Sequence, residues 1–122
     1  MTLGQLGQIS MNATDIDRAT AFYADTLNVK LLFRAGHMSF FDCGGVRLML
    51  SLPETPEFDH PGSVLYFKVP DIVIAHQELA AKGVTFLAEP HLVAKMPDHE
   101  LWMGFFKDSE GNTLALMSEK RT

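Results

Sequence analysis

Hydrophobic residues recur along this chain with two different periods, and both periods occur twice in the same order. A period of two is typical of strands with one buried face, and a period of 3.6 is typical of amphipathic helices. The predicted strands are residues 6–13, 30–34, 37–41, 46–51, 63–69, 84–88 and 101–107, followed by an alternating segment from Thr113 to Met117. The predicted helices are residues 15–27 and 71–82. Each half therefore reads as one strand, one helix and three strands.

Residues that start or end helices lie at the ends of the two helical segments. Asp15 can cap the first predicted helix, and Asp71 takes the matching place in the second half. Gly83 can end the second helix, because glycine adopts the left-handed conformation at little cost. These signals support both predicted helices independently of their periodicity.

Proline-rich segments separate the predicted elements. Pro53, Pro56 and Pro61 interrupt regular structure between the halves, and residues 89–98 are a polar segment with two further prolines that we predict to be a connection. The predicted organisation is a single domain in which module one spans about residues 5–52, a linker about 53–62, and module two about 63–119.

The segment from Phe106 to Met117 predicts a tight hairpin. Gly111 and Asn112 can form its turn, and the carboxylate of Asp108 can accept hydrogen bonds from the turn amides. Behind the turn, Thr113, Ala115 and Met117 share one face of the strand, and the leucines between them share the other. A similar segment, residues 41–51, closes the first half, and Met49 there matches Ala115.

Composition and charge exclude several classes of protein. The chain has 122 residues of which 47% are hydrophobic, enough for one compact domain with a core. It has no apolar run near the ~20 residues that cross a bilayer, and a single cysteine excludes an internal disulfide. The net charge of -5 and the absence of basic blocks argue against nucleic acid as a partner. We expect a soluble, cytoplasmic protein with no membrane partner.

Two segments resemble the vicinal oxygen chelate superfamily, the group of glyoxalases, bleomycin resistance proteins and dioxygenases. They are Asp15–Tyr23 and Asp108–Leu114, and the resemblance extends over essentially the whole chain. It implies an α+β fold in which two tandem βαβββ modules form a cup-shaped mixed sheet with helices on the outer face. It also implies a cavity inside the cup and a homodimer.

The resemblance places the metal ligands of this superfamily at Gln8, Met49, Val64 and Ala115. A divalent ion needs about three or four His or carboxylate ligands, and only Gln8 could ligate a hard cation. We therefore predict no metal or other cofactor at the usual place. A divalent metal at a non-standard site, with His99, His91 and His37 as ligands, is the alternative.

Alternation along the strands, with the register that the resemblance implies, predicts the residues that face the cup. Their aromatic, thioether and polar groups suit a small organic ligand, and the basic residues among them could hold an anion. The predicted ligand-binding residues are Gln8, Ser10, Asn12, Arg47, Met49, Tyr66, Lys68, Lys95, Met103, Phe105, Ala115 and Met117. The opposite registers, which include Leu48, Leu50, Leu114, Leu116 and Trp102, are predicted to pack against the helices.

His99 is the candidate catalytic residue, because it shares the predicted cup face and lies between two acids in Asp98-His99-Glu100. Neighbouring residues on a strand point to opposite faces, so alternation alone does not bring either acid to the imidazole. Two functions follow. The first is binding of an aromatic or partly polar small molecule without metal; the second is lyase, isomerase or dioxygenase-type chemistry that uses His99 or a metal at a non-standard site.

Overall fold

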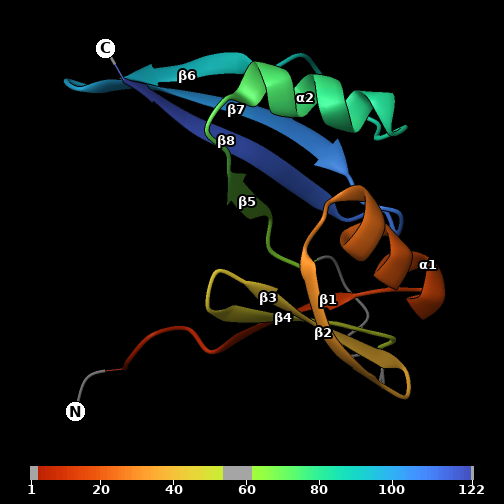
Figure 1. Ribbon diagram of the computed structural model, residues 1–122. Coiled ribbons are helices and arrows are strands. Elements are labelled where there is room, and N and C mark those ends of the chain that lie inside the picture. The colour runs from red at the N-terminus through yellow and green to blue at the C-terminus, as the bar shows by residue number, and fades with distance from the viewer. Residues whose placement is uncertain (1–2, 54–61, 122) are drawn as a thin grey trace. The chain divides into compact units, whose positions relative to one another are not determined.

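The computed structural model describes residues 3–53 and 62–121, which form two compact units, Met1–Gly62 and Ser63–Thr122 (Figure 1). Each unit contains a helical segment and a four-stranded sheet. The predicted α+β fold of two tandem βαβββ modules is therefore confirmed. Most of the predicted linker, residues 54–61, lies outside the described residues.

The first unit contains strands β1 to β4 and one helical segment after β1. Its elements are β1 (Gln8–Asn12), α1 (Ile16–Ala21), the π-helical turn η1 (Phe22–Thr26), β2 (Lys30–Ala35), β3 (Met38–Cys43) and β4 (Val46–Ser51). The single predicted helix thus changes its hydrogen-bonding pattern half-way, where the Leu27 amide donates to the Phe22 carbonyl at 3.0 Å.

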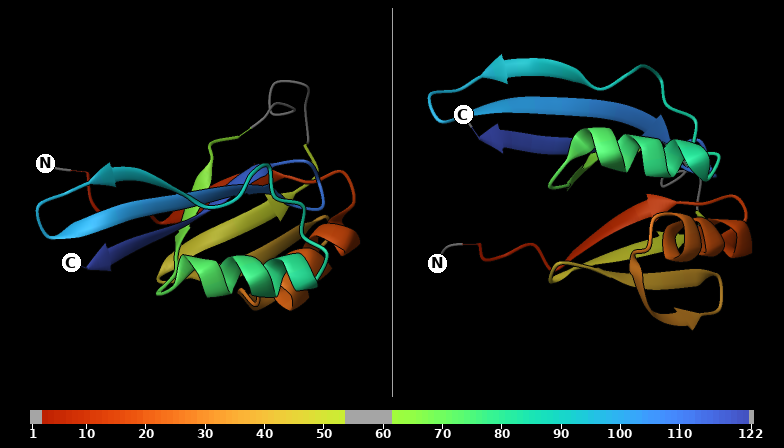
Figure 2. Two further views of the ribbon diagram at one scale, coloured as in Figure 1. Left: turned by 90° about the horizontal axis from the view of Figure 1, so that it is seen from above. Right: turned by 45° about the horizontal axis from the view of Figure 1, so that its top comes forward.

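The second unit repeats this order. Its elements are β5 (Leu65–Lys68), α2 (Ile72–Ala81), β6 (His91–Lys95), β7 (His99–Lys107) and β8 (Thr113–Arg121). β7 and β8 are each nine residues long and form an antiparallel hairpin along their whole length. In Figure 2 this hairpin continues past the N-terminal end of α2.

Strand pairing is identical in the two units. The orders are β1-β4-β3-β2 and β5-β8-β7-β6. The first strand of each unit is therefore an edge strand, and it pairs in parallel with the last strand of the same unit. α1 packs against β3 and β4, and α2 packs against β7 and β8 (Figures 1 and 2). Each sheet consequently has one face covered by its own helix and one face without a helix of its own unit.

The core of the first unit lies between α1 and its sheet. Tyr23 and Phe41 are fully buried, with ring centroids 5.8 Å apart, and Leu48 and Leu50 of β4 are 1% exposed. The helix begins at Asp15, whose carboxylate accepts a hydrogen bond from the Arg18 amide at 3.0 Å. The predicted cap and the predicted helix-facing leucines are confirmed.

The core of the second unit follows the same rule. Ile72 of α2 is buried, as are Phe106, Leu114 and Leu116 of the sheet. Asp71 caps α2 by accepting hydrogen bonds from the Val73 and Ile74 amides at 3.0 and 3.1 Å. Gly83 follows the helix with φ of 88°, which confirms its predicted role as the helix stop.

The predicted turn between β7 and β8 is also confirmed. Asp108 is 7% exposed, and its Oδ1 accepts hydrogen bonds from the Glu110 and Asn112 amides, both at 2.8 Å. Its Oδ2 accepts a third from the Asn112 side-chain amide at 2.9 Å. Gly111 has φ of 85°, a conformation that glycine adopts at little cost.

One predicted strand was wrong, and a strand was missed. Residues 84–88 form only a single bridge, Phe86 to Phe106, whereas β6 lies at residues 91–95, where we predicted a connection. Residues 85–87 lie alongside β7 with two isolated backbone hydrogen bonds, from the Leu87 amide to the Phe105 carbonyl at 2.9 Å and from the Lys107 amide to the Thr85 carbonyl at 3.2 Å. Residues 91–95 are a strand because they pair with residues 100–103 of β7, three of which lay in the predicted strand, and not because of their own periodicity.

Within the described residues, no helix has both the length and the apolar character that crossing a membrane requires.

Candidate ligand-binding faces

The helix-free face of the first sheet collects five of the predicted ligand-binding residues. Cross-strand partners share a face, and the parallel pairing of β1 with β4 sets Gln8 beside Arg47 and Ser10 beside Met49. The intervening residues, among them Met11 and Leu48, are buried toward α1. Gln8, Ser10, Asn12, Arg47 and Met49 thus lie on the face opposite α1.

Arg47 is held in place on this face by two neighbours. Its Nε donates a hydrogen bond to Gln8 Oε1 at 2.8 Å, and its guanidinium carbon lies 5.4 Å from the ring centroid of Phe40. The Gln8 side-chain amide also lies 3.8 Å from the sulfur of Met49. Among the described residues, no hydrogen bond or ion pair engages the two terminal nitrogens of Arg47, so they are available to an anionic group.

Two aromatic residues on this face were missed by the sequence analysis. Phe40 pairs with Met49 across β3 and β4, and Phe33 of β2 stacks on Phe40 with ring centroids 4.5 Å apart. The alternation of β3 could have found Phe40. Phe33 reaches this face because the pairing of β2 shifts between Leu31 and Phe33, and no sequence signal marks that shift.

The helix-free face of the second sheet is more apolar. Tyr66 of β5 lies beside Ala115 of β8, which pairs in turn with Phe105 of β7. The Tyr66 and Phe105 rings meet edge to face at 5.9 Å, and Met103 and Met117 are cross-strand partners on the same face.

Lys68 lies on the same face as these residues but is paired. Its Nζ lies 3.1 Å from Glu119 Oε1, and this hydrogen bond and charge hold the pKa of Glu119 below its ordinary value. Lys68 differs in this respect from Arg47, which forms no ion pair within the described residues although Asp42 is its cross-strand neighbour. An incoming anion would have to compete with Glu119 for Lys68.

Lys95 is not brought together with the other predicted residues. The pairing of β6 with β7 shifts between Leu92 and Ala94, and Lys95 then pairs with Glu100. Glu100 shares its face with Trp102, which together with Ile72 and Val73 of α2 lines one pocket. Lys95 therefore lies on the helix-covered face of the second sheet, and the predicted helix-side position of Trp102 is confirmed.

His99 lies on the helix-free face and is hydrogen-bonded to an acid. Its Nδ1 is 2.7 Å from Asp98 Oδ1, and Arg121 Nη1 donates to Asp98 Oδ2 at 2.6 Å. The His99 hydrogen bond, followed by its charge and the Arg121 hydrogen bond, lowers the pKa of Asp98. Asp98 reaches the imidazole because it precedes β7 and is free of strand alternation. Glu100 instead accepts from the Trp102 indole at 3.2 Å on the other face.

Cys43 at the end of β3 has a raised pKa, first because burial disfavours the thiolate and then because Asp42 is negatively charged. A raised pKa leaves less of the thiolate, which is the nucleophilic form, and Cys43 is therefore not a candidate nucleophile.

Comparison with known proteins places this fold in a family. The model of the Glyoxalase/Bleomycin resistance protein/Dioxygenase superfamily matches residues 5–116. The chain belongs to this superfamily. A glyoxylase-like domain-containing protein of Didymella fabae is 28% identical over 127 aligned positions, which cover 93% of this chain and 92% of that protein.

Solved structures from the same superfamily have the same fold. A superfamily member from Sphaerobacter thermophilus aligns with a TM-score of 0.78 at 23% identity, covering 96% of this chain and 98% of that chain. A lactoylglutathione lyase from Agrobacterium tumefaciens aligns with a TM-score of 0.75 at 20% identity, covering 97% and 96%. At these identities the likeness shows the fold and not the activity.

The side chains at the superfamily's four metal positions do not fit a divalent cation. Gln8 Oε1 already accepts the Arg47 hydrogen bond, and a cation there would meet the positive guanidinium. Met49 offers a soft thioether, and Val64 and Ala115 have no side-chain lone pairs. Residues 3–53 and 62–121 also contain no other group of three or more His, Cys, Asp or Glu side chains placed to hold a metal ion.

Proposed function

We propose that this superfamily member binds a small organic molecule on a helix-free sheet face, that of the first sheet above all, and that the molecule has an apolar body and a polar or anionic group. One observation carries the proposal. The strand registers gather the predicted ligand-binding residues, with the exception of Lys95, on the two helix-free faces. On these faces the polar side chains of Gln8, Ser10 and Arg47 and the Tyr66 ring are exposed, and four apolar side chains, those of Met49, Met103, Phe105 and Met117, are half-buried.

The first sheet supplies the polar anchor in this proposal. Arg47 is oriented by Gln8 and Phe40, and its outer edge can form two parallel hydrogen bonds to a carboxylate. Met49, the half-buried cross-strand partner of the buried Phe40, can contact an apolar group of the same ligand. By itself, the helix-free face of the second sheet is a softer surface, where the Tyr66 and Phe105 rings and the paired methionines favour van der Waals contact with an apolar ligand.

A screen of small carboxylic acids and their neutral amides by thermal unfolding tests the proposal. A ligand at about ten times its Kd adds about 1.4 kcal/mol to the unfolding free energy and raises Tm by about 5 °C. Arg47→Met should weaken binding of an acid by about tenfold or more, since a charge-assisted pair is lost. Arg34→Met is the matched control, because Arg34 lies in the same sheet but pairs with Asp17 of α1 at 3.0 Å.

If no small molecule shifts Tm, or if Arg34→Met weakens binding as much as Arg47→Met, the helix-free face is not the binding surface.

Acid-base catalysis by His99 is the second candidate function, and the hydrogen bond to Asp98 favours it. An acid on Nδ1 fixes the tautomer of the ring, so that Nε2 is left to exchange a proton with a substrate. Given a substrate that is turned over, His99→Ala should abolish kcat, and Asp98→Asn should lower it by about tenfold or more. Unchanged kcat in His99→Ala would rule out this role.

We further propose that the protein acts as a metal-free homodimer in the cytoplasm. Elemental analysis of protein purified without chelator or affinity tag, with light scattering on the same sample, tests the metal content and the oligomeric state. Stoichiometric metal that raises Tm would overturn the metal-free proposal, and a monomeric mass would overturn the dimer.

A further inference from the structure

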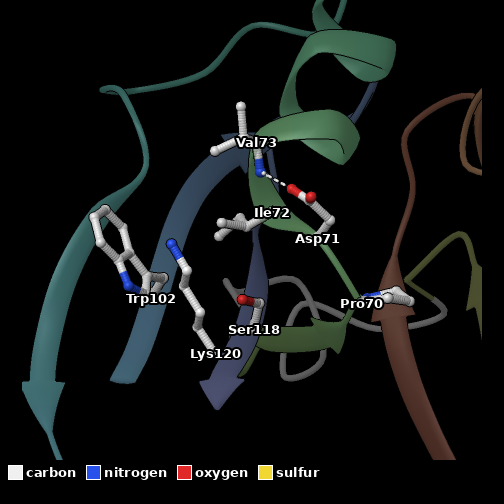
Figure 3. A pocket seen from close by; sticks show the side chains of 7 residues that line it. All are labelled: Pro70, Asp71, Ile72, Val73, Trp102, Ser118 and Lys120. Carbon is white, nitrogen blue, oxygen red and sulfur yellow. Dashed lines mark hydrogen bonds between the residues drawn. The ribbon is translucent and has the colours of Figure 1, made fainter. Parts of the chain in front are cut away.

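A pocket of about 220 Å³ lies in the second unit, on the face of the sheet that α2 covers. Its walls are residues from the N-terminal end of α2 and from β7 and β8. They are Pro70, Asp71, Ile72, Val73, Trp102, Ser118 and Lys120 (Figure 3). β7 and β8 continue past the N-terminal end of the helix (Figure 2), which leaves this part of the sheet without further helical cover. The proposed function uses none of these residues.

Ser118 gives this pocket a hydroxyl group. The residue is only 4% exposed, yet no hydrogen bond engages its hydroxyl within the described parts of the chain. Figure 3 shows the hydroxyl directed to the side of the pocket where Lys120 lies. No side-chain nitrogen or oxygen in the described residues is both fully buried and without a partner, so solvent reaches this hydroxyl, and a ligand in the pocket can accept its hydrogen bond.

Lys120 provides a positive charge in the same pocket. Its side chain extends from β8 toward the start of α2 (Figure 3), and among the described residues its ammonium forms no ion pair. The cross-strand row on this face contains Lys95, Glu100 and Lys120, two lysines and one glutamate. Glu100 also accepts the indole hydrogen bond of Trp102 at 3.2 Å. The row therefore has an excess positive charge.

Apart from Asp71, the remaining lining residues are apolar. The Trp102 indole is held by its hydrogen bond to Glu100, and Ile72 and Val73 lie across the pocket from it. The one acid among the lining residues, Asp71, is engaged by the Val73 and Ile74 amides of the helix. An aromatic ring between the indole and Ile72 would keep its anionic group near Lys120 and Ser118.

We propose that this pocket is a second ligand site, which takes a small aromatic carboxylate whose ring stacks on Trp102 and whose carboxylate pairs with Lys120 and Ser118. The pocket volume suits a molecule with a single ring. The site lies on the opposite face of the second sheet from Tyr66, Met103 and Phe105, so it does not depend on the proposed function.

The only tryptophan of the chain is in this pocket, so its fluorescence reports occupancy directly. Titration of the full chain with benzoate should change Trp102 emission saturably, with a Kd of about 0.1–1 mM for a molecule of about nine non-hydrogen atoms. Benzamide, which has the same ring and no charge, should bind at least about tenfold more weakly. Absence of a saturable change with benzoate overturns the inference.

Two variants locate the carboxylate. Lys120→Met should weaken benzoate binding by about tenfold, and Ser118→Ala by about threefold, whereas Lys30→Met in the first unit should leave Kd unchanged. If Lys120→Met and Ser118→Ala both bind benzoate as the original chain does, the carboxylate lies elsewhere and the inference is wrong.

A measurement on the unmodified protein covers the case of a variant that does not fold. In ¹⁵N-labelled protein, benzoate should shift the indole N–H resonance of Trp102 and the amides of Val73, Ser118 and Lys120. Shifts confined instead to Tyr66, Met103 and Met117 would assign benzoate to the helix-free face, in which case the pocket is not its site.

Discussion

The two sheets have the same strand order, but the cations on their helix-free faces differ in whether they form ion pairs. In the first unit, the guanidinium of Arg47 contacts the neutral Gln8 and Phe40 and forms no ion pair within the described residues, although Asp42 is its cross-strand neighbour. In the second unit, Lys68 and Arg121 are each paired with an acid, Glu119 and Asp98. One backbone plan therefore supports two different chemistries, because the side chains that a cation contacts decide whether it can meet an anionic ligand.

The cores of the two units should lose similar amounts of stability when a buried aromatic ring is removed, although their helix-free faces differ. Phe41 pairs with Leu48, and Phe106 takes the matching place opposite Leu114; both rings are fully buried. Phe41→Ala and Phe106→Ala should each lower the free energy of unfolding by about 3–5 kcal/mol, because each leaves a cavity. Urea unfolding measures the loss. A loss below about 1 kcal/mol in either variant would contradict the assignment of that ring to the core.

The turns that precede the last strand of each unit should contribute differently to the free energy of unfolding. Asp108 accepts two backbone hydrogen bonds and one side-chain hydrogen bond, whereas Asp42 in the first unit accepts one from the Gly45 amide at 2.9 Å. Asp108→Ala should cost about 2 kcal/mol, and Asp42→Ala about 0.5–1 kcal/mol. Equal losses in urea unfolding would show that the two turns contribute alike.

The acid pairs of the second unit should give a small pH dependence. Asp98 and Glu119 have pKa values below their ordinary 3.8 and 4.5, so each stabilises the folded state above those values. This contribution is lost as the pH falls through the lowered pKa. Salt should reduce it, since both acids belong to solvent-exposed pairs.

The melting temperature should therefore fall less steeply between about pH 6 and about pH 2 for a variant that carries both Asp98→Asn and Glu119→Gln than for the original chain. Curves of the same slope at low salt would show that neither pair favours the folded state.

Sequence patterns predicted most of the fold because the signals were local. The helix caps Asp15 and Asp71, the stop at Gly83 and the turn around Asp108 all act within a few residues, and all four were confirmed. β6 was missed because this strand has only five residues, follows Pro90 and lacks a clear alternation of apolar and polar residues. Pairing with β7, and no signal within the segment itself, makes residues 91–95 a strand.

The candidate site was less accessible to sequence reasoning where pairing shifts. Alternation placed Gln8, Arg47 and Tyr66 correctly relative to their cores, because β1, β4 and β5 pair without interruption. It did not find Phe33 or the true face of Lys95, since each follows a shift in register. A shift by one residue moves every later side chain to the other face.

The sequence by itself determined the repeated βαβββ order, the capped helices and the buried face of each regular strand, because these depend on periodicity and on contacts between near neighbours. Tertiary structure alone decided which polar groups meet. Gln8 reaches Arg47 from 39 residues away, and Arg121 reaches Asp98 from 23 residues away, and in both cases strand pairing sets the distance. Ser118 and Trp102 lie side by side in the wall of one pocket for the same reason, since pairing between β7 and β8 makes them cross-strand neighbours.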